Sequence, residues 1–236
     1  MTDPNPASTP DPTLGDRRRP TVLSTLPEKI RPDRAALLII DMSNDFLHPA
    51  GKTIVRGGRD AGAAWAVVPV QRRLIDAAHS AGVPVIYVSH TTLPDHASDS
   101  GPWLDARSRA SFSVVDICVD GSWGQQVIDE LTPAEDDIRV KKYRYSGFAG
   151  TNLDLVLRSL GRSTVICAGV STNACVEATA REAFSHDYYV VIPEDACASW
   201  DMALHQATLD TARHRYATVG PAADIIEIWS SAQERR

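Results

Sequence analysis

Several features that would assign a protein to a particular class are missing from this 236-residue chain. Its apolar runs fall well short of the roughly 18 residues that a membrane-spanning helix needs. The formal net charge is -6, and the only basic cluster lies at residues 17–19, so the electrostatic footprint of a nucleic-acid-binding protein is absent. We therefore predict neither a membrane protein nor a nucleic-acid-binding protein.

Cysteine is scarce and irregularly spaced. The four cysteines are Cys118, Cys167, Cys175 and Cys197, and they form no Cys-x-x-Cys pair and no His/Cys spacing typical of a metal site. The polar, proline-rich N-terminus is unlike a secretory signal, so we expect a cytoplasmic protein with reduced thiols. Each cysteine must then be explained by packing or by chemistry.

The composition predicts one domain preceded by an arm. Residues 1–32 contain seven of the fifteen prolines and almost no apolar periodicity, which predicts a flexible or surface-lying segment. With 43% hydrophobic residues overall, the remaining chain, 33–236, is long enough to bury the core of a single domain.

Short apolar runs alternate with segments of helical periodicity. The runs predict six strands, at residues 35–40, 83–88, 138–142, 164–168, 188–192 and 217–219. Helices are predicted between them, at residues 63–81, 124–131, 150–160, 176–184 and 202–214. This alternation predicts a three-layer α/β/α fold in which helices cover both faces of a mostly parallel six-stranded sheet. The long polar segment 89–120 has no periodicity, and we expect it to shape a pocket.

Cys175 lies where a predicted strand turns into a helix. Residues 171–173 (Ser-Thr-Asn) are all good helix N-caps, so the helix is expected to begin near this cysteine. Free backbone N–H groups and the helix dipole would favour its thiolate, which is the nucleophilic form. A buried packing thiol explains the same stretch equally well, so a nucleophile needs support from elsewhere.

Two other polar residues end predicted parallel strands, and both support a nucleophile. Asp41 follows the first strand and Lys142 ends the third, so they are expected to meet Cys175 at the carboxyl edge of the sheet. Asp41 can take the thiol proton, and Lys142 can stabilise the resulting anion. Backbone N–H groups of the turn at residues 169–175 can bind an oxyanion. Together they predict hydrolysis of a C–N bond through a thioester-type intermediate.

The segments around these residues resemble the signatures of the isochorismatase-like cysteine hydrolases. They are residues 41–46 (Asp-Met-Ser-Asn-Asp-Phe), 142–153 (beginning Lys-Tyr-Arg-Tyr-Ser-Gly-Phe) and 169–177 (Gly-Val-Ser-Thr-Asn-Ala-Cys-Val-Glu). The resemblance implies that Asp41, Lys142 and Cys175 form a catalytic triad. Lys141 competes for the lysine role, but the family spacing Lys-x-x-Tyr-Ser-x-Phe selects Lys142.

The resemblance also carries expectations about the backbone and about metals. It implies a cis peptide bond between Val170 and Ser171, with the N–H groups of Ser171 and Cys175 forming the oxyanion hole. Nicotinamidases of the same fold have an Asp-x-His metal motif after the second strand, and residues 88–92 (Val-Ser-His-Thr-Thr) lack it. We therefore expect no metal and no other cofactor.

Within the family, the ureidoacrylate amidohydrolase branch is the most similar, through residues 121–123, 127–133 and 142–148. This implies a small ureido, carbamoyl or amide substrate. Lactams, nicotinamide-like amides and isochorismate are the alternatives, and Cys175 argues against isochorismate because members that hydrolyse it tend to lack this cysteine. Ser43, where the family commonly has Gln, and the segment 89–112 depart from the pattern and leave the substrate open. A non-enzymatic scaffold is the alternative from another class.

Five residues are candidates for substrate contact, and each has a structural alternative. Their sequence positions place them near the predicted edge of the sheet, but a turn residue, an exposed histidine or a core aromatic would explain them as well. The candidates are Asn44, His90, Trp123, Tyr145 and Phe148. The family also implies a homo-oligomer, either a dimer or a tetramer.

Overall fold

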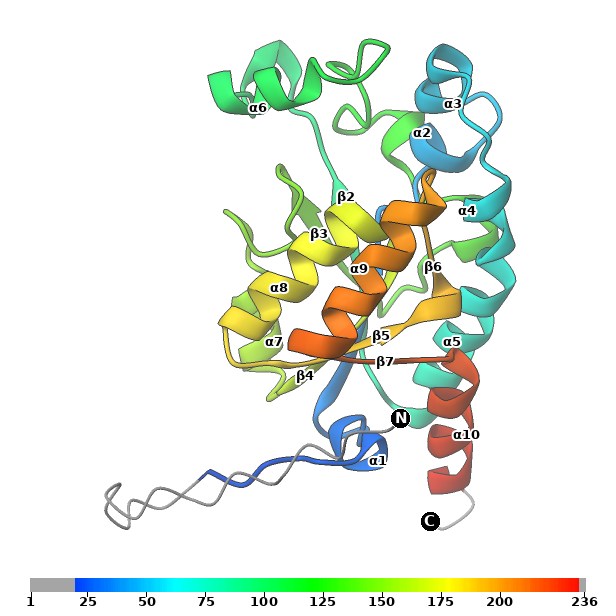
Figure 1. Ribbon diagram of the computed structural model, residues 1–236, viewed down its shortest axis with the longest axis vertical. Coiled ribbons are helices and arrows are strands. Elements are labelled where there is room, and N and C mark those ends of the chain that lie inside the picture. The colour runs from blue at the N-terminus through cyan, green and yellow to red at the C-terminus, as the bar shows by residue number, and fades with distance from the viewer. Residues whose placement is uncertain (1–19, 234–236) are drawn as a thin grey trace, which may run out of the picture.

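A computed structural model describes residues 20–233 of the chain, and its centre is a parallel sheet (Figure 1). Seven strands form it, in the spatial order β3-β2-β1-β4-β5-β7, with β6 paired to β4. All pairings between these strands are parallel. The strands are β1 (Ala35–Ile40), β2 (Val85–His90), β3 (Ile138–Lys142), β4 (Thr164–Val170), β5 (Tyr189–Pro193), β6 (Cys197–Ala198) and β7 (Ala217–Gly220).

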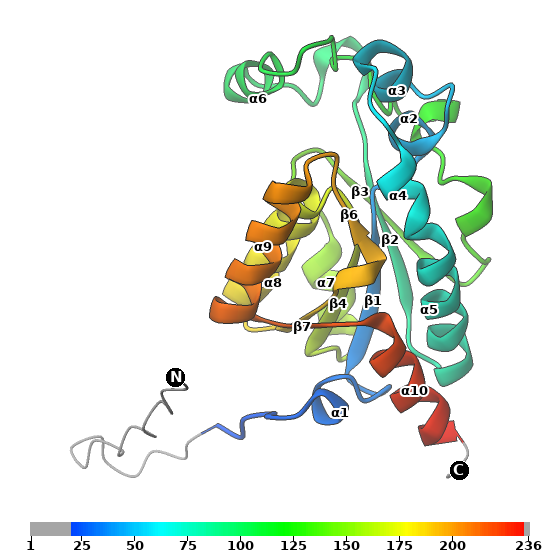
Figure 2. The ribbon, with the colours of Figure 1, turned by 45° about the vertical axis from the view of Figure 1, so that its right-hand side comes forward.

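Helices cover both faces of this sheet, which confirms the predicted three-layer α/β/α fold (Figure 2). Helices α4 (Gly62–Ala66), α5 (Val68–Ala81) and α10 (Ala222–Gln233) pack on one face, and α7 (Leu153–Ser159), α8 (Glu177–Ser185) and α9 (Met202–Arg215) pack on the other. Side chains of β1 alternate between the two cores, with Leu37 and Ile39 in the first and Leu38 and Ile40 in the second. No helix within residues 20–233 has the length and apolar character needed to cross a bilayer.

The short elements lie mainly beyond the carboxyl ends of the strands. They include α2 (Asn44–Leu47), α3 (Lys52–Gly57) and α6 (Gly101–Arg107), and α6 stands above the sheet in both views (Figures 1 and 2). The predicted loop 89–120 therefore contains a helix, which Ser100 caps by accepting a hydrogen bond from Trp103 N at 3.4 Å. The turns are η1 (Pro94–His96), η2 (Trp123–Gln125), η3 (Asp129–Leu131), η4 (Thr172–Val176) and η5 (Glu194–Ala196).

Three predicted elements differ from the structure. The helix predicted at 63–81 is divided at Val67, because Pro69 has no N–H to continue the first helix and instead starts a new one. The single helix predicted at 124–131 is instead two short turns, η2 and η3, because the backbone between them bonds to residues 42–44: Asn44 N donates to Gln126 O at 2.9 Å and Ile128 N to Met42 O at 3.0 Å. The sheet has seven strands rather than the predicted six, because the short strand β6 forms an additional pairing with β4.

Of the predicted arm, the structure describes residues 20–32, and these contact the domain from Leu23 onward, where Leu23 N donates to the Tyr189 hydroxyl at 3.0 Å. Thr25 caps the short helix α1 (Leu26–Lys29), and the following Ile30 is completely buried. Trp229 of α10 donates its indole hydrogen bond to Ile30 O at 2.8 Å. Residues 1–19 of the predicted arm lie outside the described residues.

The sheet register brings the ends of four strands together. Ile40 of β1 lies opposite Val88 of β2 and Gly169 of β4, so Asp41 emerges beside both neighbouring strands. His90, the last residue of β2, lies opposite Lys142, the last residue of β3. Residues distant in sequence therefore converge at this carboxyl edge, which is where open parallel sheets bind ligands.

Candidate active site

Asp41 is held rigidly where β1 ends. Its backbone N–H donates to Val88 O at 3.0 Å, and its carboxylate oxygen Oδ1 accepts from His90 N at 2.6 Å. The residue is 1% exposed and has a φ of 56°, in the left-handed region that Asp tolerates better than most residues. Strand β2 thus orients the carboxylate and leaves Oδ2 for other partners.

Lys142 connects this carboxylate to Cys175. Its completely buried ammonium lies 2.8 Å from Asp41 Oδ2 and donates to Cys175 Sγ at 3.2 Å and to Arg144 O at 3.1 Å. Burial by itself lowers the pKa of Lys142, but the charges of Asp41 and Cys175 and the hydrogen bonds to both together outweigh it and raise the pKa above the ordinary value. Lys142 is therefore a cation at neutral pH.

Lys141, the alternative lysine, faces the other way. Alternate residues of a strand point to opposite faces, and Lys141 Nζ lies 2.6 Å from Asp120 Oδ1 near the surface. Lys142 is thus the lysine that the structure brings to Asp41 and Cys175.

Cys175 lies in the turn η4, between β4 and α8. Burial and then the charge of Asp41 raise the pKa of its thiol, and Lys142 only partly opposes them. The expected preference for a thiolate is therefore wrong for the resting site. The physical reason is that α8 begins only at Glu177, while burial and a neighbouring carboxylate both disfavour a second negative charge. A base must accept the thiol proton before or during any attack by the sulfur.

The end of strand β4, just before the turn with Cys175, requires a glycine. Gly169 has a φ of 133°, and a Cβ at this position would lie 2.1 Å from Ile40 O. The next peptide bond, between Val170 and Ser171, is cis, as the resemblance implies. Ser171 and Cys175 both line the same large cavity.

This cavity has a volume of about 850 Å³ and opens above the edge of the sheet. Aromatic side chains form much of its wall. Trp103 of α6 lies between Tyr145 and His90, with ring centroids 5.0 and 5.9 Å away, and Phe46 and Trp200 form another pair at 6.3 Å. Two of the five predicted contact residues, His90 and Tyr145, therefore line the cavity.

The surroundings of His90 favour its neutral form, since burial lowers the pKa of its imidazole well below the usual value and nearby cations lower it further. These cations are Lys142, Arg107 and Arg144. The ring therefore contributes an aromatic surface and neutral nitrogen atoms to the cavity rather than a positive charge.

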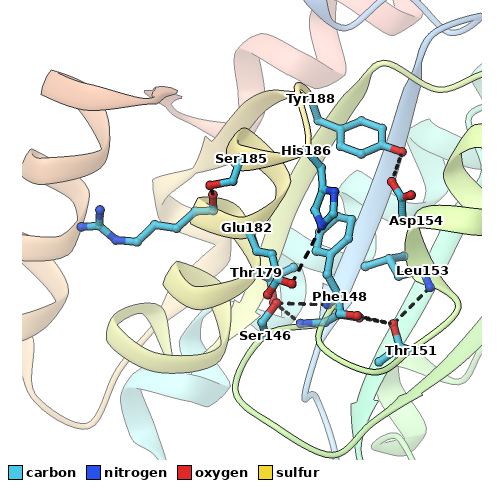
Figure 3. A network of polar contacts seen from close by, with 12 residues as sticks. Ser146, Phe148, Thr151, Leu153, Asp154, Thr179, Glu182, Ser185, His186 and Tyr188 are labelled. Carbon is cyan, nitrogen blue, oxygen red and sulfur yellow. Dashed lines mark hydrogen bonds and ion pairs between the residues drawn. The ribbon is translucent and has the colours of Figure 1, made fainter.

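The other three candidates lie outside the cavity lining. Asn44 uses its side-chain amide to donate to Trp123 O at 2.9 Å, and the ring of Trp123, 46% exposed, packs at 4.9 Å from His48. Phe148 is buried between α7 and α8, where it stacks on His186 with centroids 5.3 Å apart (Figure 3). The turn interpretation therefore describes Asn44 and the core interpretation describes Phe148, whereas Trp123 is neither buried in the core nor part of the cavity lining.

The loop after Lys142 is tied to the segment that contains Cys175. Thr179 of α8 donates its hydroxyl hydrogen bond to Cys175 O at 2.7 Å and accepts one from Gly147 N at 2.9 Å. Figure 3 shows the surrounding contacts, in which Ser146 and Thr151 hold the same loop through backbone atoms. This hydroxyl couples the positions of the lysine loop and the cysteine turn.

Several cavity residues were not identified from the sequence. Arg59, Arg107 and Trp200 all line the cavity, although none belongs to a recognisable motif. The only available signal was the length of the polar segment 89–120, which contains Arg107. Within residues 20–233, no cluster of three or more His, Cys, Asp or Glu side chains is arranged to hold a metal ion.

Comparison with known proteins gives the family. The family model described as "Isochorismatase domain" matches residues 35–224, which is most of the chain. This chain belongs to the isochorismatase family. A ureidoacrylate amidohydrolase RutB from Rhizobium rhizogenes is 33% identical over 192 residues, covering 77% of this chain and 78% of the relative.

Solved structures of the family superpose on most of the chain. A cysteine hydrolase from Pseudomonas syringae pv. phaseolicola has a TM-score of 0.78 and 29% identity, covering 92% of this chain and all of its own. An N-carbamoylsarcosine amidase from Thermoplasma acidophilum has a TM-score of 0.64 and 31% identity, covering 80% of this chain and 96% of its own.

Proposed function

We propose that this protein is a metal-independent cysteine amidohydrolase that cleaves a C–N bond in a small ureido, carbamoyl or amide substrate. One observation carries the proposal: the buried Lys142 ammonium contacts both Asp41 Oδ2, at 2.8 Å, and Cys175 Sγ, at 3.2 Å. A nucleophile, a base and a cation thus meet at the wall of a cavity large enough for a small molecule. The named relatives that act on ureidoacrylate and on N-carbamoylsarcosine support a substrate of this type.

Asp41 accepts the thiol proton in the first chemical step. As this proton moves, Cys175 Sγ attacks the carbonyl carbon, and the carbonyl π electrons move to oxygen. The N–H groups of Ser171 and Cys175 are assigned to the resulting oxyanion. Lys142 remains protonated and offsets the negative charge that passes between Asp41, the sulfur and the intermediate.

The proton on Asp41 is then returned to the leaving nitrogen. Collapse of the tetrahedral intermediate breaks the C–N bond, releases the amine and leaves an acyl or carbamoyl group on Cys175. A water molecule attacks this thioester or thiocarbamate while Asp41 accepts its proton, and in the second collapse Asp41 returns that proton to the departing sulfur and restores the thiol. One acid–base group therefore serves both halves of the reaction.

A product assay tests this function. We expect release of ammonia or amine from at least one compound in a set of ureido acids, carbamoyl amines, simple amides and lactams. Carbamoyl substrates should release carbon dioxide as well. Cys175→Ala should abolish turnover, whereas Cys197→Ala, which removes a buried thiol outside the cavity lining, serves as the control. Turnover that persists in Cys175→Ala at the wild-type rate would refute the assigned nucleophile.

A further inference from the structure

Asn173 has a side-chain amide that takes no part in the proton transfers between Asp41 and Cys175. It belongs to η4, two residues before Cys175, is partly buried and lines the large cavity. Its Oδ1 accepts a hydrogen bond from the Ser199 hydroxyl at 2.6 Å. Its Nδ2 remains accessible and has no hydrogen-bond partner within residues 20–233. Two amide N–H donors are therefore available in the turn that carries the nucleophile.

Ser199 determines which end of this amide is left free. It follows β6, is only 5% exposed, and its Oγ accepts a hydrogen bond from Asp201 N at 3.2 Å. The single hydroxyl proton is therefore available for Asn173 Oδ1, which can only accept. The opposite orientation of the amide would leave that proton unused, because Nδ2 can only donate. The amide oxygen is thus held at Ser199, and the amide nitrogen is left for another partner.

Cys175 lies between two groups of side chains at the edge of the sheet. It follows β4, whose last residues pair with β1 on one edge and with β6 on the other. Asp41 and Lys142 form their ion pair on the side of β1. Asn173 and Ser199 form their hydrogen bond on the side of β6. A carbonyl carbon at the sulfur therefore has the acid–base pair on one side and the Asn173 amide on the other.

These two sides suit different substituents of that carbon. Asp41 returns its proton to the leaving nitrogen, so this nitrogen must face Asp41. The carbonyl oxygen is another substituent of the same carbon and points away from Asp41. It gains negative charge as the sulfur attacks, and donors that are already in place stabilise this charge most effectively. The Asn173 amide supplies such a donor in the same turn as the N–H groups of Ser171 and Cys175.

We infer that Asn173 is a catalytic residue whose Nδ2 donates a hydrogen bond to the substrate carbonyl oxygen and stabilises the oxyanion, with Ser199 as the positioning residue that orients the amide. This inference rests on the proposed function and adds a side-chain donor to the two backbone N–H groups assigned there. No bond to Asn173 forms or breaks. Its effect should therefore appear in the rate of acyl transfer and not in the reactivity of the sulfur itself.

Acylation of Cys175 by p-nitrophenyl acetate tests this donor without requiring amide turnover. The sulfur attacks the ester carbonyl, the oxyanion forms, and its collapse releases p-nitrophenolate, whose absorbance measures the rate. We expect Asn173→Ala to slow acylation about 100-fold, the order found when one oxyanion donor is removed. Alkylation by iodoacetamide passes through no oxyanion, because the sulfur displaces iodide from a saturated carbon. Alkylation of Cys175 should therefore keep its wild-type rate in Asn173→Ala.

Further variants separate the donor from a change in charge or packing. Asn173→Asp replaces the donor by a carboxylate of the same shape and should slow acylation at least as much as Asn173→Ala. Asn152→Asp makes the same change at an exposed residue just before α7 and is the matched control. Ser199→Ala should slow acylation by a smaller factor, because the amide remains but loses the group that orients it. Cys175→Ala supplies the background rate, and Asn173→Ser replaces Asn173→Ala if circular dichroism shows the latter to be unfolded.

Three results would overturn the inference. The first is acylation of Asn173→Ala at the wild-type rate, and the second is an equal loss of acylation and alkylation, which would mean that Asn173 only holds the turn. The third is a wild type in which p-nitrophenyl acetate does not acylate Cys175. A wild type that hydrolyses no amide, but is acylated at a rate that depends on Asn173, refutes the amidohydrolase and retains the donor, so the two proposals fail separately.

Discussion

Lys142 Nζ lies 2.8 Å from Asp41 Oδ2, and neither side chain is exposed by more than 1%. Each charge stabilises the other at a site where solvation by water is nearly absent. Removing one partner of such a pair therefore leaves an uncompensated buried charge, which is strongly destabilising.

Lys142→Met should lose both activity and stability. We expect turnover to fall at least about 100-fold, the order found when one transition-state donor is removed. The free energy of unfolding should fall by about 3–5 kcal/mol. Lys141→Met is the matched control, because Lys141 forms an ion pair with Asp120 near the surface. Urea unfolding and an ammonia assay measure the two effects, and similar losses in both variants would contradict the role assigned to Lys142.

Asp41→Asn should separate thiol reactivity from turnover. Asp41 raises the pKa of the Cys175 thiol and Lys142 lowers it, so removing the carboxylate charge should lower the pKa. Alkylation of Cys175 by iodoacetamide should then reach its half-maximal rate at a lower pH than in the wild type, while turnover is lost with the base. Below the wild-type midpoint this shift appears as faster alkylation of Asp41→Asn than of the wild type at the same pH, which mass spectrometry of the modified peptide measures from pH 6 to about 10.

The control for this shift is Asp120→Asn, which removes the carboxylate that pairs with Lys141 at the surface. It should leave the alkylation profile of Cys175 unchanged. A profile of Asp41→Asn that coincides with the wild type, or moves to higher pH, would mean that Asp41 does not act on the thiol as described.

Gly169→Ala should prevent normal packing of β4 against β1. The added Cβ would lie 2.1 Å from Ile40 O at a φ of 133°, so the two central strands would have to separate. We expect the free energy of unfolding to fall by at least about 3 kcal/mol. Gly220→Ala, with no atom within 4 Å of the added Cβ, should change it by no more than about 0.5 kcal/mol. Thermal and urea unfolding of both variants compare them, and equal stability would contradict the close approach.

Thr179→Val should lower kcat more than it raises KM. The Thr179 hydroxyl holds the backbone carbonyl of Cys175 and so positions the nucleophile, but Thr179 does not line the cavity where substrate binds. Its hydroxyl bridges Cys175 O and Gly147 N, at 2.7 and 2.9 Å. Removing it leaves both groups without this partner, at a cost of about 1–3 kcal/mol in unfolding free energy. Thr179→Ser should restore kcat, since the serine hydroxyl can make the same two bonds.

Thr211→Val is the control for Thr179→Val. Thr211 makes a similar bond within its own helix, to Ala207 O at 2.8 Å, but on an exposed surface. Little change in stability or kcat is expected there. A stability loss in Thr179→Val with kcat and KM both unchanged would restrict Thr179 to a structural role.

Local sequence patterns were sufficient to predict the main strands and helices. They were insufficient where a segment forms its hydrogen bonds with backbone that is distant in the sequence. Continuous apolar runs identified the buried strands because both faces of a parallel sheet are covered. The segment 124–131 has a helical pattern, but its backbone groups form hydrogen bonds with residues 42–44 instead of within a helix. Helix α10 was not predicted, although its buried residues Ala222, Ile225 and Trp229 have helical spacing.

The sequence by itself determined the α/β/α architecture and the meeting of Asp41, Lys142 and Cys175, because strand ends of a parallel sheet share one edge. Only the tertiary structure decided the protonation of the Cys175 thiol and the composition of the cavity wall. Both depend on which distant groups surround a site and how far water is removed from it. For the same reason, Phe148 belongs to the core and Arg107 lines the cavity.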